Sequence, residues 1–388
     1  MKHDTTENAV ADLLGRLVAC PSMNPGSDGT PGPGYGERPL AELLAALLQS
    51  WGARTQLVEL APGRCNLVAT WLGQNPDRSL LLDAHMDTVG VKGMTIPPFE
   101  SQVRGGRLYG RGACDTKGPM AAMLLAIRKI LDEEGQLPVT LHFAATGDEE
   151  DGAMGASRLV ESKLLVDAVI VAEPTEMKIV YAHKGACRFR ISLTGKAAHS
   201  SVPWLGINAV EAAAEMIHII HHEFTEHVQQ QSHPELGKPT VCVGTITGGI
   251  KINIVPEHCQ FEVDCRCLPG ELRNHLESAM DGLLSKVAAN YPGLQVGCEV
   301  FQWYPALAGS HGDVFVEKMT DACGKVTGSR LAGTAPYATN GGFYSQLNLP
   351  CVVFGPGSIA QAHTADEFIE LAQVEQAVEV YSRMIRTF

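Results

Sequence analysis

Histidines and carboxylates follow several apolar segments of the sequence, each where the segment ends. His85 and Asp87 follow LLLDA, Glu149 and Glu150 follow LHFAATGD, and Glu173 follows VIVA. Ligands of open α/β sheets bind at the carboxyl ends of strands, so we expect these separate segments to converge on one crevice.

Two further residues complete this set. Asp115 lies in the glycine-rich loop GRGACDTKG, and His363 comes shortly after the apolar segment CVVFGPG. Each cluster alone is equally typical of a solvated surface, and an acidic run suits the start of a helix. Their joint occurrence favours a metal site, because nitrogen and oxygen ligands without thiolate suit Zn, Co or Mn.

The number of candidate ligands predicts two metal ions. Five protein ligands would crowd one catalytic ion, whereas a shared carboxylate gives each of two ions three ligands and leaves room for water. Neighbouring side chains of an extended backbone point to opposite sides, so one of Glu149 and Glu150 can face metal while the other serves as general base. Asp87 could accept a ring N–H from His85 and so fix the tautomer that binds metal.

The elements that must position these groups alternate between strands and helices. Apolar runs predict strands at 66–71, 79–83, 139–145, 168–171 and 351–354. Helical spacing predicts helices at 9–18, 40–51, 117–131, 152–162 and 371–385. Continuous apolar strands between helices predict an α/β domain with a mostly parallel sheet flanked by helices.

A different order of elements is expected between residues 183 and 300. The pattern predicts strands at 188–194, 241–247, 259–267 and 295–301, with helices at 208–224 and 271–289. This β-α-β-β-α-β order is the ferredoxin-like unit. We therefore expect a catalytic metal-binding domain of residues 1–182 and 301–388, into which residues 183–300 are inserted as a separate α+β domain.

Composition and charge restrict the class of protein. The chain has 388 residues, 45% of them apolar, which suits two domains. Its 43 acidic residues outnumber 30 basic residues, so the net charge of -13 opposes a nucleic-acid partner. Eleven cysteines without a C-x-x-C pair indicate free thiols in a reducing compartment. No apolar run suits a membrane span or a signal segment, so we expect a soluble cytoplasmic protein without a membrane partner.

Several segments, taken together, resemble one enzyme family. They are LLDAHMDTV, GRGACDTKGPMAAML, ATGDEEDGAMGA, AEPTE, TGKAAHSSVPWLGINAVE, DCRCLPG and GPGSIAQAHTADEF. In order and spacing they resemble the dinuclear zinc amidohydrolase and peptidase family, which includes acetylornithine deacetylase, succinyl-diaminopimelate desuccinylase, glutamate carboxypeptidase and the aminoacylases. Such a match is specific for the family and much less so for the substrate.

The resemblance implies a role for each residue of the metal centre. One zinc ion would be held by His85, Asp115 and Glu173, and the second by Asp115, Glu150 and His363, with Asp115 as the bridge. Glu149 would be the general base for a water between the two ions, and this water would attack the amide carbonyl. The resemblance also implies a cis peptide after Asp115, beside which we expect Cys114 to pack as a small apolar side chain.

For the inserted domain, the resemblance implies a lid that also forms a homodimer. His199, in AAHSS, matches the family's oxyanion-stabilising histidine. Arg266, in DCRCLPG, resembles the family's binder of a substrate carboxylate, a task that suits a guanidinium fork. Asn253 and Gly342 are further candidates for substrate contact.

Three other histidines have the spacing of a helical metal site. His218, His221 and His222 lie on one expected helix of the inserted domain. Histidines in such a position more often face solvent or an interface, so we expect these three not to bind metal.

The expected reaction is metal-dependent hydrolysis of an amide bond in a small N-acylated amino acid or dipeptide. Within the family the segments are most similar to acetylornithine deacetylase, an enzyme of arginine biosynthesis. Asn340 departs from the family, which commonly has an acidic residue there, and a lost charge would change how a cationic side chain is held. Succinyl-diaminopimelate desuccinylase and a general acylamino-acid hydrolase or dipeptidase therefore stay open, and a non-catalytic ligand-binding protein of this fold is a remote alternative.

Overall fold

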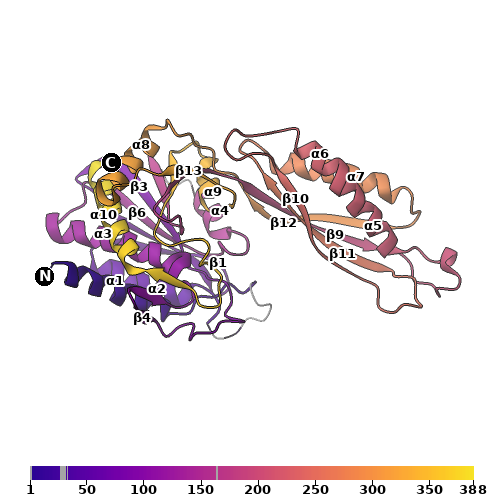
Figure 1. Ribbon diagram of the computed structural model, residues 1–388, viewed down its shortest axis with the longest axis horizontal. Coiled ribbons are helices and arrows are strands. Elements are labelled where there is room, and N and C mark those ends of the chain that lie inside the picture. Colours follow the sequence, from indigo (N-terminus) through magenta and orange to yellow (C-terminus); the bar gives the residue numbers. More distant parts are fainter. Residues whose placement is uncertain (1, 27–31, 33, 163–164) are drawn as a thin grey trace. The chain divides into compact units, whose positions relative to one another are not determined.

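The computed structural model describes residues 2–26, 32, 34–162 and 165–388, and it divides into two compact units (Figure 1). The first unit comprises Met1–Ala182, Leu307–Thr334 and Thr339–Phe388, and the second comprises His183–Ala306 and Ala335–Ala338. The expected boundary at residue 300 falls inside strand β12 (Gln295–Tyr304). That strand completes the sheet of the second unit, which therefore continues to Ala306.

An eight-stranded sheet forms the centre of the first unit, in the order β1-β2-β6-β3-β7-β14-β8-β13. The strands are β1 (Arg54–Ala61), β2 (Arg64–Trp71), β6 (Val139–Thr146), β3 (Asn75–His85), β7 (Ala168–Val171), β14 (Cys351–Val353), β8 (Ile179–His183) and β13 (Ala332–Ala335). The four central strands, from β6 to β14, run parallel, and Leu82 of β3 lies between Phe143 and Ile170 of its neighbours.

The sheet is mixed, because β2 and β8 run opposite to the four central strands. β2 is antiparallel to both β1 and β6, and β8 is antiparallel to β14. The parallel strands are buried on both faces, as their continuous apolar runs predict. β1 is a largely exposed edge strand, which explains why its sequence carries no apolar run.

Helices cover the sheet in two groups (Figure 1). The helices α1 (Lys2–Val18), α3 (Gly118–Glu134), α8 (Val314–Thr327) and α10 (Leu371–Thr387) pack against one another. The helix α2 (Arg38–Ser50) packs on β1 and β2, while α4 (Met154–Glu161) contacts α9 (Gly341–Ser345). Tyr344 of α9 donates a hydrogen bond to Asp83 of β3, which fixes α9 beside the strand that ends at His85.

A small antiparallel sheet joins two distant segments of the first unit. It pairs β4 (Gln102–Arg104) with β5 (Arg107–Tyr109), and β5 with β15 (Phe368–Glu370). These strands have three residues each, which is too short for a periodic signal in the sequence. Their pairing brings the segment after His363 next to the segment before Asp115.

The second unit is a four-stranded antiparallel sheet covered on one face by helices. Its strands are β9 (Gly185–Thr194), β10 (Thr240–Gly248), β11 (His258–Cys267) and β12, in the order β10-β11-β9-β12. The helical segments are α5 (Ala209–Ile219), its continuation Ile220–Phe224, α6 (Thr225–Val228) and α7 (Arg273–Ala288). The buried side chains of β9 and β11 pack against α5 and α7, so this unit has a core of its own.

None of the described helices is both long enough and apolar enough to cross a bilayer. All eleven cysteines are free thiols.

Candidate metal centre

Four of the five candidate ligands come from the carboxyl ends of the parallel strands. His85 is the last residue of β3, Glu150 comes four residues after β6, and Glu173 comes two residues after β7. His363 lies in the segment that follows β14. Because these strands are parallel neighbours in the sheet, their ends meet at one edge.

Asp115 reaches the same edge from the buried turn Ala113–Lys117, which precedes α3. The Asp115–Thr116 peptide is cis, as the resemblance implied. Cys114 is fully buried, its Sγ donates to the carbonyl oxygen of Ser358 at 3.3 Å, and burial raises the pKa of its thiol. Cys114 therefore stays a protonated, packed side chain beside the site.

The structure brings the candidate ligands into two groups that share one carboxylate. The ligand atoms within each group lie within 4.8 Å of one another. One group is His85, Asp115 and Glu173, and the other is Asp115, Glu150 and His363. Oδ1 of Asp115 lies 3.0 Å from Nε2 of His85, and Oδ2 lies 3.3 Å from Nε2 of His363. Each oxygen of Asp115 thus faces a different histidine, as a bridging carboxylate requires.

The surroundings of the Glu173 carboxylate indicate whether the two ligand groups suit cations. Its Oε1 is buried and has no hydrogen-bond partner among the described residues. Burial raises the pKa of Glu173 well above its usual range, and the nearby charges of Glu149 and Asp115 raise it further. A buried carboxylate without a partner is costly, and a bound cation removes that cost. The donor set of imidazole and carboxylate therefore fits divalent metal ions.

The second group opens toward solvent. The side chain of His363 is 49% exposed, whereas His85 and Asp115 are buried. Hydrogen bonds with Asp115 and Glu150 raise the pKa of His363 to about 10. Burial alone would raise the pKa of Asp115, but hydrogen bonds from the two histidines lower it below its ordinary value.

Glu149 lies beside these groups without belonging to either of them. Burial raises its pKa to about 8, while His85 opposes this rise and the charge of Glu150 adds to it. Its neighbour Glu150 lies 3.1 Å from Nε2 of His363. The two adjacent glutamates therefore occupy different positions, one within a ligand group and one next to it.

Asp87 orders both His85 and the turn that carries the glutamates. Nδ1 of His85 donates to the main-chain oxygen of Asp87 at 2.9 Å, whereas the nearest carboxylate oxygen of Asp87 is 3.7 Å away. The main chain, rather than the expected carboxylate, therefore fixes the His85 tautomer, because the carboxylate is engaged elsewhere. Its Oδ1 and Oδ2 each accept a backbone N–H at 3.0 Å, from Glu149 and Glu150 respectively.

Behind Asp87 lies a buried polar network that the sequence analysis missed. Nδ2 of Asn24 donates to Asp87 at 2.8 Å and to Asp148 at 3.1 Å. Arg64 donates to Asp148 at 2.6 Å and also pairs with the buried Glu37. Arg64 comes two residues before the predicted strand 66–71 and is the first residue of β2. A charge next to an apolar run is the one signal that could have drawn attention to this network.

Asn340 lies deeper than its expected role in substrate binding suggests. It is 1% exposed, and its Nδ2 donates to Asp83 at 3.2 Å and to Thr146 at 3.0 Å. Burial raises the pKa of Asp83 to about 6. An acidic residue at position 340 would place a second carboxylate against Asp83, so an amide here avoids a buried repulsion. Gly342 follows within α9, where it is also buried.

The remaining candidates lie in the second unit. Nδ1 of the exposed His199 accepts the backbone N–H of Ser201 at 3.2 Å, which leaves the ring hydrogen of the neutral form on Nε2. Asn253 is next to this segment, since its carbonyl oxygen accepts the N–H of Ser200 at 3.1 Å. Arg266 lies on β11, and its Nε donates to Oδ2 of Asp264 at 2.8 Å.

The three helical histidines do not form a ligand group with any described residue. The ring centroid of His222 lies 4.5 Å from that of His218 and 5.0 Å from that of His221. The ring planes meet at 59° and 80°, so these exposed imidazoles make tilted and edge-on contacts with one another.

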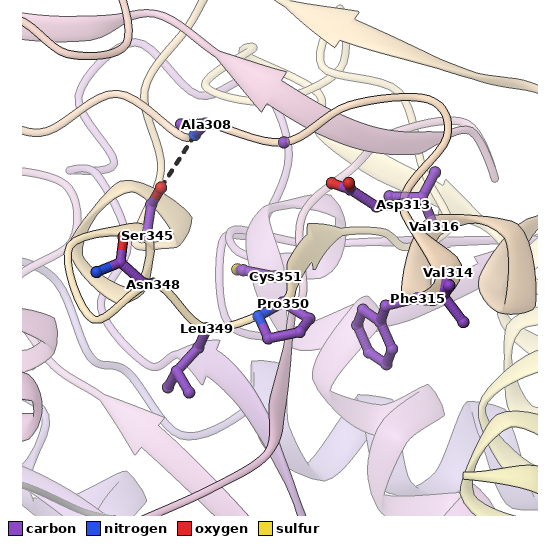
Figure 2. Close-up of a pocket in the computed structure, with 11 residues that line it drawn as sticks. Ala308, Asp313, Val314, Phe315, Val316, Ser345, Asn348, Leu349, Pro350 and Cys351 are labelled. Carbon is purple, nitrogen blue, oxygen red and sulfur yellow. Dashed lines mark hydrogen bonds between the residues drawn. The ribbon is translucent and has the colours of Figure 1, made fainter.

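A separate cavity of about 410 Å³ lies in the first unit, beside the start of α8 (Figure 2). Among its described lining residues Asp313 carries the single carboxylate, and this carboxylate accepts hydrogen bonds from Ser310. Leu349, Pro350 and Phe315 supply apolar walls. No histidine is among its described lining residues, so it does not repeat the donor set of imidazole and carboxylate.

The sequence places this centre in a known family. Residues 81–387 match the family described as Peptidase family M20/M25/M40. The chain belongs to the M20 metallopeptidase family. Members of the M20 family are metal-dependent hydrolases with dinuclear metal sites, so the paired ligand groups agree with family membership.

Individual M20 proteins resemble this chain along nearly its whole length. Acetylornithine deacetylase of Vibrio campbellii is 32% identical over 353 residues, which cover 90% of this chain and 91% of that protein. The metallo-carboxypeptidase Sso-CP2 of Sulfolobus solfataricus has a TM-score of 0.81 at 21% identity, covering 96% of this chain and 97% of that one. A dinuclear metal-binding M20 peptidase of Bacillus subtilis has a TM-score of 0.68 at 17% identity, covering 99% and 98%. These two structures share the fold of the M20 chain described here.

Proposed function

We propose that this protein hydrolyses the amide bond of a small N-acylated amino acid, and that N-acetylornithine is its substrate. The observation that carries the proposal is the pair of ligand groups joined by Asp115, with Glu149 next to them. The similarity to acetylornithine deacetylase over most of the chain supports this substrate.

The proposed metal is zinc, with cobalt or manganese as substitutes. His85, Asp115 and Glu173 would hold one ion, and Asp115, Glu150 and His363 the other. When bound, two such ions polarise the substrate carbonyl and lower the pKa of water at the site. The two positive ions also offset the cluster of buried carboxylates, which otherwise repel one another.

Glu149 acts as the general base in the proposed mechanism. Its carboxylate accepts a proton from the attacking water and returns that proton to the nitrogen of the leaving amine. Asp87 supports this step by holding the backbone N–H of Glu149 and of Glu150. The base and the adjacent ligand are thereby fixed by one buried carboxylate.

Residues of the second unit bind the substrate in this proposal. His199 donates its Nε2 hydrogen to the developing oxyanion of the carbonyl group. Arg266 binds the α-carboxylate, because its contact with Asp264 through Nε leaves the terminal fork for a carboxylate. Burial lowers the pKa of Lys184, and the neighbouring charge of Arg266 lowers it further. An anion would relieve this repulsion. Asn253 of the second unit and Gly342 of α9 in the first unit complete the proposed substrate contacts.

A homodimer in the cytoplasm, formed through the second unit, is part of the proposal. β10 is an edge strand of its sheet, and Ile250 and Ile252 next to it are 88% and 98% exposed. A second copy would cover these side chains and the open strand edge. Sedimentation should show a dimer that the double change Ile250→Lys and Ile252→Lys converts to a monomer, while Leu331→Lys in the first unit leaves it intact.

A substrate panel tests the proposed specificity. Protein loaded with zinc or cobalt should cleave N-acetylornithine faster than N-succinyl-diaminopimelate, other acylamino acids and dipeptides. The opposite order between the first two would assign the chain to desuccinylation, and a preference for dipeptides would assign it to peptidase activity. Failure to cleave any of them, with two metal ions bound, would favour the non-catalytic alternative.

A further inference from the structure

The turn that presents Asp115 is held by one buried carboxylate that belongs to neither ligand group. Glu367 is 1% exposed, and its side chain reaches this turn from the segment after His363. Oε1 accepts the backbone N–H of Cys114 at 2.8 Å and that of Asp115 at 3.0 Å. Oε2 accepts the N–H of Gly112 at 3.0 Å. Three backbone donors in and next to the turn, those of Gly112, Cys114 and Asp115, therefore converge on a single side chain.

Arg111 supplies the opposite charge. Its Nη1 donates to Oε2 of Glu367 at 2.7 Å, and its Nε donates to the carbonyl oxygen of Gly90 at 3.0 Å. Both side chains are buried, so removing either partner would leave an uncompensated charge. The main chain of Glu367 adds a further tie, because its carbonyl oxygen accepts the N–H of Gly110 at 3.0 Å.

The turn has little freedom apart from these contacts. Gly112 has a φ of +78°, and a Cβ at this position would lie 2.7 Å from Cγ2 of Thr88. The side chain of Asp115 must present one oxygen to each histidine, so a small rotation of this turn would disturb both ligand groups at once.

We propose that Glu367 is a positioning residue that holds the bridging Asp115, so that the affinity for both metal ions depends on this one side chain. The inference rests on the dinuclear centre proposed above. A ligand that serves only one group, such as Glu173, should by contrast affect mainly one ion.

The experiment measures metal binding to the folded protein rather than activity. Metal-free protein is titrated with Co²⁺ or with Zn²⁺ against a chromophoric chelator, and metal content is measured after dialysis. Glu367→Gln places amide hydrogens against backbone donors, and Glu367→Asp keeps the charge beside Arg111 but shortens the reach. We expect each variant to bind both ions about 10- to 100-fold more weakly, the range typical of residues that orient metal ligands.

Glu370→Gln is the matched control. Glu370 of β15 pairs with Arg107 of β5, three residues along the chain from Glu367. Both side chains of that pair are about 40% exposed, and neither makes a hydrogen bond to the turn of Asp115. This variant should keep two ions at wild-type affinity. Glu173→Gln should weaken the binding of one ion much more than that of the other.

Circular dichroism and thermal unfolding of the metal-free forms separate positioning from stability. A purely structural role would lower the unfolding temperature and leave the binding constants of the folded protein unchanged, which would overturn the proposal. Loss of only one ion in Glu367→Asp would also overturn it, and this variant decides the matter if Glu367→Gln does not fold. If the wild-type chain binds no metal, the proposed function fails first. If it binds two ions and Glu367→Asp binds them equally well, only the present inference fails.

Discussion

The two units carry their chemical groups in opposite ways. In the first unit His85, Asp87 and Glu173 are buried, and a chain of internal hydrogen bonds fixes the first two. In the second unit His199 is exposed and Arg266 is half-buried, each with a single local polar partner. Buried charges are costly unless they are compensated, whereas exposed charges cost little. We therefore expect substitutions in the first unit to act on metal binding and stability, and those in the second to act on substrate steps alone.

The largest expected effect is on Glu149, which in the proposed mechanism transfers the proton but does not hold a metal ion. Glu149→Ala should lower kcat by about 10²- to 10⁴-fold, because the proposed general base is lost. Metal content should stay near two ions per chain. The exposed Glu161→Ala serves as control and should match the wild type. Retained turnover in Glu149→Ala would remove the general base from the mechanism.

The next effect belongs to the second unit. His199→Ala should lower kcat by about 10²- to 10³-fold through loss of an oxyanion donor. Its unfolding temperature and metal content should not change, since the side chain is exposed. His222→Ala is the matched control and should leave kcat unchanged. An equal loss of activity in both variants would show that surface histidines of this unit have no specific role.

A smaller effect should separate binding from chemistry. Arg266→Ala should raise KM by about 10- to 100-fold with little change in kcat, because a hydrogen-bonded charge pair with the substrate is lost. Arg266→Lys should recover part of this loss, since the charge stays but the fork does not. Arg190→Ala, which breaks an ion pair on the same sheet, should leave KM unchanged. A fall in kcat alone would contradict the proposed carboxylate contact.

The smallest effect tests why substitutions in the first unit should affect stability and those in the second should not. The cause could be the burial of the side chain or the unit to which it belongs. His183 is buried in the second unit, and burial lowers its pKa to about 4. Because the unfolded chain takes up a proton near pH 6.5, stability is complete above that pH and is lost as the pH falls toward 4. Between pH 7.5 and 5 the metal-free protein should lose about 2 kcal/mol more than His183→Gln, measured by denaturant unfolding. Parallel losses in the two proteins would contradict this assignment.

The sequence was sufficient for the parts of the fold that depend on local pattern. Strands β3, β6 and β7 were predicted within a few residues, apart from a longer start of β3, because they are continuous apolar runs. The amphipathic pattern of β9 and β11 likewise revealed the ferredoxin-like order. The edge strand β1 and the helix α8 were missed. β1 is largely exposed on an edge of the sheet, and its sequence has no clear period.

Of the candidate site, the sequence predicted the candidate metal ligands but not the hydrogen bonds that hold them. The metal-binding groups follow strands or lie in a glycine-rich loop, so their approximate place could be inferred before any contact was known. Asn24 and Glu367 carry no such signal, because their importance comes from hydrogen bonds to distant partners. Those partners are 63 and 124 residues from Asn24 and up to 256 residues from Glu367. The contact of Asn340 with Asp83 was hidden for the same reason.

The topology of the second unit has one further consequence. Apart from the short segment Ala335–Ala338, the chain enters it through β9 and leaves it through β12. These strands are direct neighbours in which Ala186 pairs with Tyr304. The start of β9 and the end of β12 therefore lie side by side at one end of the sheet. A unit connected in this way can be replaced by a linker of a few glycines, or exchanged for the corresponding unit of a relative. The path of the remaining chain would not change.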